Sequence, residues 1–293
     1  MHLTILSRRA GIYTTRRLAQ AARLRGARVR VLDPLRVEMH LDQQPGMYYQ
    51  HRRLKRTDVV IPRIAPSVQA YGLAVVNHFT MMGVPTLNDA NGIAASRNKM
   101  RALQLLAAHG VPVPPTVMAA NAKELKALVE LVGGVPVLIK LLTPTERSGV
   151  MVCETLQSME AALEAVLSIG HNLLVQRYVR PKRERDLRAL VVGDKVAAWV
   201  ERRPSPGRLL HTLARGASLK AVKVPAALDE LAVKAARVVG LDVAAVDLLE
   251  AGTGPMVFDV NSSPGLKGLE AATGKDLALP IVGRAEELVR GSK

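Results

Sequence analysis

Apolar residues in the first part of the chain fall into short continuous runs, separated by longer segments in which they recur every three or four positions. Short runs predict strands, and the longer spacing predicts helices. The expected elements are the strands His2–Leu6, Val29–Leu32, Asp58–Ile61 and Pro85–Asn88 and the helices Thr14–Arg25 and Tyr71–Met82. Because strands that alternate with helices form a parallel sheet covered by helices, we expect residues 1–94 to form a small α/β domain.

A second, smaller α+β domain is expected over residues 95–176. Its expected helices are Ser96–His109, Lys123–Val132 and Met159–Ile169, and its expected strands are Pro136–Leu142, Val150–Cys153 and Leu173–Tyr178. A glycine follows the first of these helices directly, and a glycine pair follows the second, as expected where helices end.

Residues 177–293 are expected to form a third domain. Its expected elements are the strands Asp186–Val192 and Lys195–Arg203, the helices Ala227–Val239 and Leu277–Arg290, and a long polar segment at Pro204–Ser218. The apolar runs Val243–Leu249 and Pro255–Val260 flank a glycine-containing turn, which predicts a β-hairpin.

Two acidic residues oppose each other in this hairpin. Counted back from the turn, Asp247 and Asp259 face each other within about one residue of register, and Asn261 shares a face with Asp259. Two carboxylates and an amide are oxygen ligands of the kind that Mg²⁺ prefers. The alternative is that the two carboxylates flank an ordinary exposed turn and pair with nearby Arg or Lys side chains.

Lys140 lies inside the apolar run VPVLIKLL. Because burial of an unpaired ammonium group is costly, this position favours a phosphate-binding role. The alternative is a lysine at a sheet edge that extends its charge to solvent. The loop that follows, Thr143–Gly149, has backbone N–H groups that could cover phosphates, or it is a plain surface hairpin.

Asp186 and Arg188 share one face of a strand. They form either a cross-strand ion pair on the solvent side, or a pair in which Asp186 binds a ribose hydroxyl and Arg188 neutralises a developing phosphate charge. Further arginines, whose planar fork suits carboxylates and phosphates, cluster around the long polar segment. They are Arg202, Arg203, Arg208 and Arg215.

The composition restricts the classes of molecule that the protein is expected to bind. A net charge of +16 favours acidic substrates or polyanions, whereas an aromatic content of 3% disfavours the stacking of single-stranded nucleic acid. One cysteine, Cys153, excludes an internal disulfide and a four-cysteine zinc site, and suits a reducing cytoplasm. No transmembrane helix or signal peptide is expected, because the apolar runs are too short.

Eight segments in order resemble the ATP-grasp superfamily and, within it, the RimK-type α-L-glutamate ligases, which add glutamate to the tail of a small-subunit ribosomal protein. They are LTILSRR, VLDPL, VIPRIA, SRNKMRALQLLAAHGVPVPPT, LVGGVPVLIKLL, LLVQRYV, RDLRALVVGDKVAAWVERR and VDLLEA…VFDVNSSPGLKGLE. The resemblance implies an N-terminal parallel α/β domain, a central α+β domain and a C-terminal antiparallel sheet, with ATP between the last two.

The resemblance also implies roles for individual residues. Lys99 and Lys140 look like the ATP-phosphate lysines, and Gln176, Arg177 and Tyr178 look like the hinge that meets adenine. Asp186 looks like a nucleotide contact, and Arg188 like the arginine near the transferred phosphate. The implied ligands of Mg²⁺, or of Mn²⁺, are Asp247, Asp259 and Asn261, and the segment Ser263–Gly268 looks like the loop near the amino-acid site.

The chain departs from the family pattern at several positions. The loop Thr143–Gly149 reads TPTERSG where EGTQGIG is usual, and Leu210-His211-Thr212 stands where Arg-Ser-Asn is usual. Arg177, Asp259 and Lys267 each occupy a position where glutamate is usual. Asp259 shortens a ligand but keeps its chemistry, and Lys267 bears on the choice of amino acid or acceptor.

We therefore expect an ATP-dependent carboxylate–amine ligase that works through an acyl phosphate and adds L-glutamate to a C-terminal carboxylate, either a ribosomal protein tail or oligoglutamate. Two alternatives remain open. The first is a ligase acting on another acceptor, such as a cofactor, a carrier protein or a peptide. The second is a non-catalytic module that docks on the ribosome or RNA. The resemblance also implies a homo-oligomer, a dimer or a tetramer.

Overall fold

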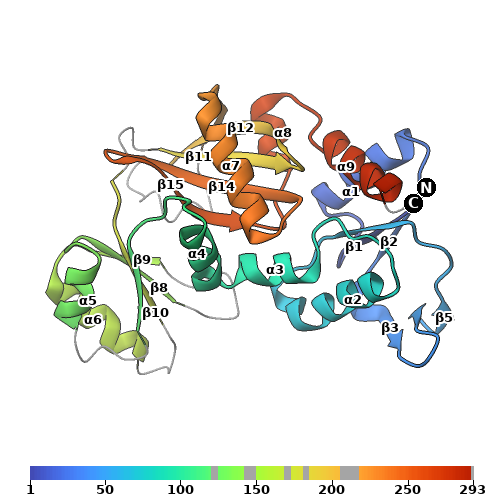
Figure 1. Ribbon diagram of the computed structural model, residues 1–293, viewed down its shortest axis with the longest axis horizontal. Coiled ribbons are helices and arrows are strands. Elements are labelled where there is room, and N and C mark those ends of the chain that lie inside the picture. The colour runs from blue at the N-terminus through green and yellow to red at the C-terminus, as the bar shows by residue number, and fades with distance from the viewer. Residues whose placement is uncertain (120–124, 142–149, 168–172, 181–184, 205–217, 292–293) are drawn as a thin grey trace.

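The computed structural model describes residues 1–119, 125–141, 150–167, 173–180, 185–204 and 218–291 (Figure 1). In the described part of the chain, no helix is both long enough and apolar enough to cross a membrane.

The N-terminal sheet is parallel and has the strand order β2 (Arg28–Leu32), β1 (His2–Leu6) and β6 (Val59–Pro62). One face packs against α1 (Tyr13–Leu24) and the closing helix α9 (Ala278–Gly291), and the other packs against α2 (Gln69–Met81). The helix α9, near the end of the sequence, thus completes the first domain (Figure 1).

Two sequence predictions in this region are corrected. Pro85–Asn88 is not a strand, since only a single parallel bridge joins Thr86 to Val60. The segment after β2, for which no strand was predicted, forms a small antiparallel sheet, preceded by the short 3-10 helix Pro34–Arg36. Its strands are β3 (Val37–His40), β4 (Gly46–Tyr49) and β5 (Arg52–Arg53).

The predicted helix Ser96–His109 is two helices, α3 (Ala90–Arg97) and α4 (Lys99–Ala108). Asn98 interrupts them with extended backbone angles, and its side chain accepts a hydrogen bond from the N–H of Arg101 at 3.0 Å. Because asparagine side chains compete for backbone groups in this way, they favour helix starts over helix interiors. Arg97 and Lys99 therefore lie on opposite sides of a break.

The central sheet is antiparallel, with the order β7 (Thr116–Ala119), β10 (Leu173–Arg177), β8 (Val137–Leu141) and β9 (Val150–Cys153). The helices α5 (Leu125–Leu131) and α6 (Leu156–Leu167) cover it, and Val129 and Met159 pack against Val137, Ile139 and Val175. β7 was not predicted, because prolines dominate the segment before it.

The third sheet is antiparallel and has five strands. Their order is β13 (Ser218–Ala221), β12 (Lys195–Arg203), β11 (Asp186–Val192), β14 (Val243–Ala251) and β15 (Gly254–Asn261). One face packs against α7 (Ala226–Val239), and the other packs against α8 (Lys267–Thr273) and the N-terminal domain. α3 approaches the end of α7 so closely that a Cβ on Gly92 would lie 2.1 Å from the carbonyl oxygen of Gly240.

Candidate active site

Asp247 and Asp259 are direct partners in the β14–β15 register, where the hairpin pattern predicts a facing within about one residue. A bulge between Asp247 and Leu248 sets this register. Leu248 pairs with Val257, so that Phe258 is passed over and Asp259 stands opposite Asp247. Bulges are common beside active sites because they redirect a side chain. The side-chain oxygen of Asn261, two residues on, accepts the N–H of Ser263 at 2.8 Å.

Asp247 is buried and bound by two arginines. Arg188, opposite it on β11, donates to both carboxylate oxygens at 2.7 Å, and Arg202 donates at 2.8 Å. Arg202 also donates to Asp186 at 2.5 Å, and these two residues are direct partners between β12 and β11. Cross-strand ion pairing, one of the two alternatives for Asp186 and Arg188, is therefore present, but Asp186 and Asp247 are inside the protein and not on a solvent face.

The two carboxyl groups of this network differ in their electrostatics. Burial alone would raise the pKa of Asp247, but the charges of Arg188 and Arg202 outweigh it and hold the pKa below its ordinary value. Burial raises the pKa of Asp186 to about 6, because its single close arginine only partly offsets the loss of water. A proton is therefore held more readily on Asp186 than on Asp247.

Lys99, at the start of α4, donates to Asp259 at 2.6 Å. The exposed fractions of the two side chains, 39% and 25%, leave this pair accessible to a ligand, in contrast to the buried Asp247. The contact joins the helix break at Asn98 to the hairpin. Lys99 and Asp259, which are separated by 160 positions, thus meet at the place where the sequence analysis put phosphate and metal contacts.

Lys140 reaches the same region from the central sheet. Its ammonium donates to the side-chain oxygen of Gln176 at 2.7 Å, and Gln176 in turn donates to Thr116 at 2.7 Å. Among the described residues, Lys140 forms no salt bridge. Burial lowers the pKa of Lys140 to about 8, with Asp259 opposing and Lys99 reinforcing the effect. The alternative of a lysine that snorkels at a sheet edge does not fit, because β8 is an inner strand between β10 and β9.

Arg177 does not join these residues. It follows Gln176 on β10 and so points to the opposite face, where a Cβ on Gly133 would lie 3.3 Å from its guanidinium. The backbone N–H of Tyr178 donates to Pro136 at 3.0 Å. The loop Thr143–Gly149, the triplet Leu210–Thr212, Arg208 and Arg215 lie outside the described residues.

Asn88 binds both strands of the hairpin, a role that no sequence pattern predicted. It is buried with a φ of 73°, its amide donates to the carbonyls of Val243 and Ser262, and it accepts from the N–H of Val243. These bonds anchor the start of β14 and the end of β15 to the N-terminal domain. A single asparagine in a polar stretch carries no pattern from which this role follows.

The donor set fits a magnesium nucleotide. No cluster of three or more His, Cys, Asp or Glu side chains suited to a metal occurs in the part of the chain that the structure describes. The available set is two carboxylates and an amide, which suits an ion that also binds phosphate oxygens. In the loop beyond Asn261, the hydroxyl oxygen of Ser263 is buried with no partner among the described residues, as in a site that awaits a ligand.

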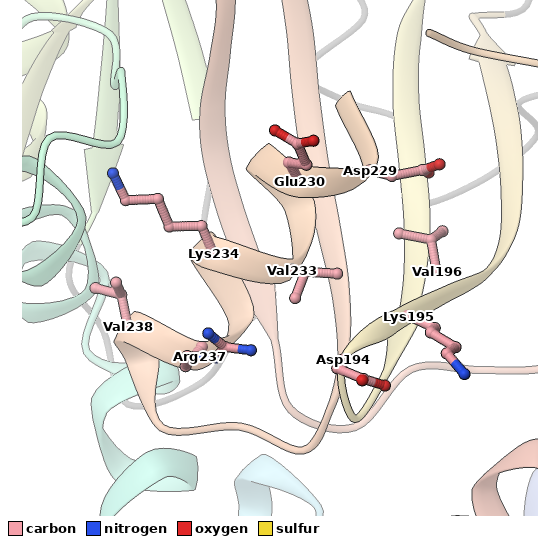
Figure 2. A pocket seen from close by; sticks show the side chains of 9 residues that line it. All are labelled: Asp194, Lys195, Val196, Asp229, Glu230, Val233, Lys234, Arg237 and Val238. Carbon is pink, nitrogen blue, oxygen red and sulfur yellow. The ribbon is translucent and has the colours of Figure 1, made fainter. Parts of the chain in front are cut away.

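A separate groove of about 580 Å³ lies between α7 and the β11–β12 turn (Figure 2). Its lining includes acidic and basic side chains, among them Asp194, Glu230, Lys195 and Lys234. Strand alternation places the Asp247 network on the sheet face that packs against α8 and the N-terminal domain, opposite α7. The groove therefore does not belong to the candidate site.

Solved structures with the same architecture define the class of fold. An ATP-grasp ligase, PsnB, complexed with a phosphomimetic precursor variant, Mg and ADP has a TM-score of 0.75 at 18% identity, and covers 98% of this chain and 97% of its own. The RimK domain protein ATP-grasp from Sphaerobacter thermophilus has a TM-score of 0.75 at 21% identity, with coverages of 97% and 99%. D-alanine–D-alanine ligase from Bacillus anthracis, complexed with ATP, has a TM-score of 0.69 at 13% identity, with coverages of 100% and 98%. The chain has the ATP-grasp fold, as the resemblance implied.

Sequence comparison resolves the family. Residues 1–93 match the model of the RimK PreATP-grasp domain, and residues 96–284 match that of the RimK-like ATP-grasp domain. Probable alpha-L-glutamate ligases from Pseudomonas aeruginosa and Aeromonas salmonicida are each 44% identical over 283 residues, which is 96% of this chain and 94% or 95% of theirs. The chain belongs to the RimK-like ATP-grasp family. The chain is an ATP-grasp ligase, which confirms the predicted enzyme class.

Proposed function

We propose that this ligase adds L-glutamate to a carboxylate in the cytoplasm, forming a peptide bond through an acyl phosphate. Relatives that share 44% of its residues over nearly their whole length are named probable alpha-L-glutamate ligases. The observation that carries the proposal is the meeting of Lys140, which has no described salt-bridge partner, with the Lys99–Asp259 pair and the Asp247 network.

The reaction balances in two steps. An oxygen of the acceptor carboxylate attacks the γ-phosphorus of ATP, and the bond to the bridging oxygen breaks to release ADP. The amine of glutamate then attacks the acyl carbon and loses a proton, and inorganic phosphate leaves with the electron pair of its bond to that carbon. Activation by phosphate turns a poor leaving group into a good one, so the protein mainly has to position charge.

Four residues of the site supply positive charge for the phosphates. We propose that Lys99 and Lys140 bind phosphate oxygens and that Arg188 stabilises the transferred phosphoryl group. Together with Arg202, these cations outnumber the carboxylates of Asp186, Asp247 and Asp259 by one. This balance suits a ligand that brings more negative than positive charge.

The metal ligands in this proposal are Asp247, Asp259 and Asn261. Magnesium, or manganese, would neutralise charge on the phosphoryl oxygens when bound there. Asp259 and Asn261 share a strand face and are partly exposed, so they can accept a ligand without a change of fold. Asp247 holds two arginines, and it can serve as a metal ligand only if part of that contact is given up.

We propose three units for the chain, 1–94, 95–176 and 177–293, with the nucleotide between the last two. Gln176, Arg177 and Tyr178 cross this boundary and would offer backbone groups to adenine, and Asp186 would bind the ribose. A homo-oligomer, either a dimer or a tetramer, completes the proposal, and sedimentation analysis of the purified chain tests it.

The decisive experiment is mass spectrometry of a reaction that contains the purified protein, Mg-ATP and L-glutamate without an added acceptor. The proposal predicts a ladder of oligoglutamates and ADP release, both lost in Lys140→Met. Lys126→Met, an exposed lysine of the same central domain, is the matched control and should retain the ladder. ADP release only after cell extract is added would indicate another acceptor. If the reaction yields no oligoglutamate ladder and no ADP, with or without cell extract, the proposal is contradicted.

A further inference from the structure

Arg63 stands at the carboxyl edge of the N-terminal parallel sheet. It directly follows β6, and its backbone N–H donates to the carbonyl of Leu6 at 2.8 Å, which fixes it beside the end of β1. Loops at the carboxyl ends of parallel strands are the usual place for ligands in open α/β sheets. No residue of this edge takes part in the nucleotide site described above.

No carboxylate of the described residues pairs with the guanidinium of Arg63. Its half-buried side chain forms no salt bridge and no hydrogen bond with any described residue. Burial, together with the like charge of Arg97, lowers the pKa of Arg63 to about 10. An arginine that is partly removed from water and lies beside a like charge is unfavourable unless an anion joins it.

Arg30, in the same domain, shows how the fold satisfies an arginine that only supports structure. Burial lowers its pKa as well, but its guanidinium donates to the hydroxyl of Thr4 at 2.9 Å and to the carbonyls of Lys55 and Arg56 at 2.7 and 2.8 Å. A fourth bond reaches Thr57. Among the described residues, Arg63 has no such set of acceptors, so its guanidinium remains available to a ligand.

Arg97 connects this position to the active site. It ends α3 and donates to the carbonyl of Ile64, the residue after Arg63. Two positions further along, Lys99 binds Asp259. In Figure 1, α3 lies between the N-terminal domain and the domain that carries β14 and β15. A molecule bound at Arg63 and Arg97 would therefore lie on the N-terminal side of the nucleotide site.

We propose that Arg63, with Arg97 beside it, binds a carboxylate of a substrate, either the incoming amino acid or the acidic acceptor. This inference rests on the proposed function, in which both substrates carry carboxylates that do not react. The planar fork of arginine matches a carboxylate with two parallel hydrogen bonds. Phosphates of the nucleotide are accounted for by the lysines, so a substrate carboxylate is the anion that remains.

The kinetic test uses Arg63→Gln in the full chain, with L-glutamate and the acceptor titrated separately at saturating Mg-ATP. Loss of a charged hydrogen-bonded contact should raise one of the two KM values by about 10- to 100-fold, whereas the KM for ATP stays within about twofold. The KM that rises identifies the source of the carboxylate. Arg63→Lys, which keeps the charge without the fork, should recover part of the loss.

Arg28→Gln is the matched control. Arg28 is exposed at the start of β2, on the amino edge of the same sheet, and forms no described side-chain contact. The Arg28→Gln variant should have the same KM values as the wild type for ATP, L-glutamate and the acceptor. Unchanged KM values for both glutamate and acceptor in Arg63→Gln would overturn the proposal.

A second measurement does not depend on activity. With Mg-ADP present, L-glutamate or oligoglutamate should raise the Tm of the wild type, and Arg63→Gln should abolish that shift while melting no lower than the wild type without the carboxylate. A lower Tm in the variant with the carboxylate shift retained would assign Arg63 a structural role and overturn the proposal. An equal shift with inorganic phosphate would overturn the assignment to a carboxylate.

The kinetic titration and the Tm shift together distinguish a failure of the carboxylate site from a failure of the proposed function. If the wild type makes no ligation product but shows a carboxylate shift that requires Arg63, the carboxylate site stands and the proposed function fails. If ligation occurs and Arg63→Gln changes neither KM nor the shift, the proposed function stands and the carboxylate site fails.

Discussion

The two antiparallel sheets that meet at the site manage buried charge in opposite ways. In the five-stranded sheet, Asp186, Arg188, Arg202 and Asp247 neutralise one another through short, direct hydrogen bonds. In the central sheet, Lys140 lies in an apolar strand and, among the described residues, donates to the neutral side chain of Gln176 without forming a salt bridge. The first arrangement fixes the geometry before any ligand arrives, whereas the second leaves a charge that a ligand can satisfy.

This contrast assigns different tasks to the two sheets. Buried ion pairs add little net stability, but loss of one member leaves the other without compensation. The paired network is thus sensitive to mutation without being responsive to ligand. An ammonium group with a lowered pKa is already unfavourable in the ligand-free protein, and phosphate binding removes that cost. A carboxylate bound to Arg63 in the N-terminal domain would likewise remove the cost of a charge that is partly withdrawn from water.

The largest effect should come from Asp247→Ala. Its loss leaves Arg188 and Arg202 with three fewer hydrogen bonds in a buried place, and should cost about 3–5 kcal/mol of unfolding free energy. Urea denaturation measures this, with the exposed Asp194→Ala as the control. A loss below about 1 kcal/mol would show that the network is not needed as a unit.

The change in unfolding free energy caused by Lys140→Met should have the opposite sign to that caused by Asp247→Ala. The pKa of Lys140 is about 8 in the folded protein and near its ordinary 10.5 when unfolded, so between these values the unfolded chain binds more protons. Wild-type stability should therefore rise from pH 8 to 10.5, by about 2–3 kcal/mol. The variant should lack this rise and be more stable at pH 7. A rise that persists in Lys140→Met would assign it to another group.

Asp186→Asn tests the weaker member of the paired network. Because the pKa of Asp186 is raised to about 6, its proton stabilises the folded state at low pH, and this contribution is lost as the pH rises from about 4 to 6. Between these pH values, the fall in unfolding free energy should be about 1–2 kcal/mol smaller in Asp186→Asn than in the wild type. Chemical denaturation at half-unit pH steps measures it, and identical profiles would contradict the asymmetry between Asp186 and Asp247.

Asp259→Ala should have the smallest effect on stability, below about 1 kcal/mol, because its pair with Lys99 is partly exposed. Turnover of Mg-ATP should nevertheless fall at least about 100-fold, since a charge-bearing ligand of the phosphate site is lost. Retained turnover in a folded Asp259→Ala variant would refute the hairpin as a metal site.

Local patterns in the sequence predicted much of this arrangement. Strands β1, β9, β11 and β12 have the predicted bounds. Counting back from the turn placed Asp247 and Asp259 opposite each other within about one residue, and the bulge in β14–β15 makes up that residue. The pattern placed Lys140 in an apolar strand and Asp186 beside Arg188. These features depend on the period of a strand or the length of a turn, which a single segment contains.

Features that depend on contacts between distant segments were not predictable in this way. The break at Asn98 looks like a continuous helix in sequence, because the residues on both sides favour helix. The bonds of Asn88 to the hairpin and of Arg202 to both carboxylates form only when remote strands meet. The short strands β3 to β5 are polar and interrupted, so their alternation is too brief to stand out.

Proton uptake on nucleotide binding tests most directly whether Lys140 is the charge held for the ligand. Isothermal titration of the protein with magnesium and a non-hydrolysable ATP analogue, at pH 8.5 in buffers of different ionisation enthalpy, gives the number of protons bound. If phosphate contact returns the pKa of Lys140 to its ordinary value, the wild type should take up roughly 0.7 proton. Lys140→Met should take up none. Equal uptake by the two proteins, or none by the wild type, would contradict the account.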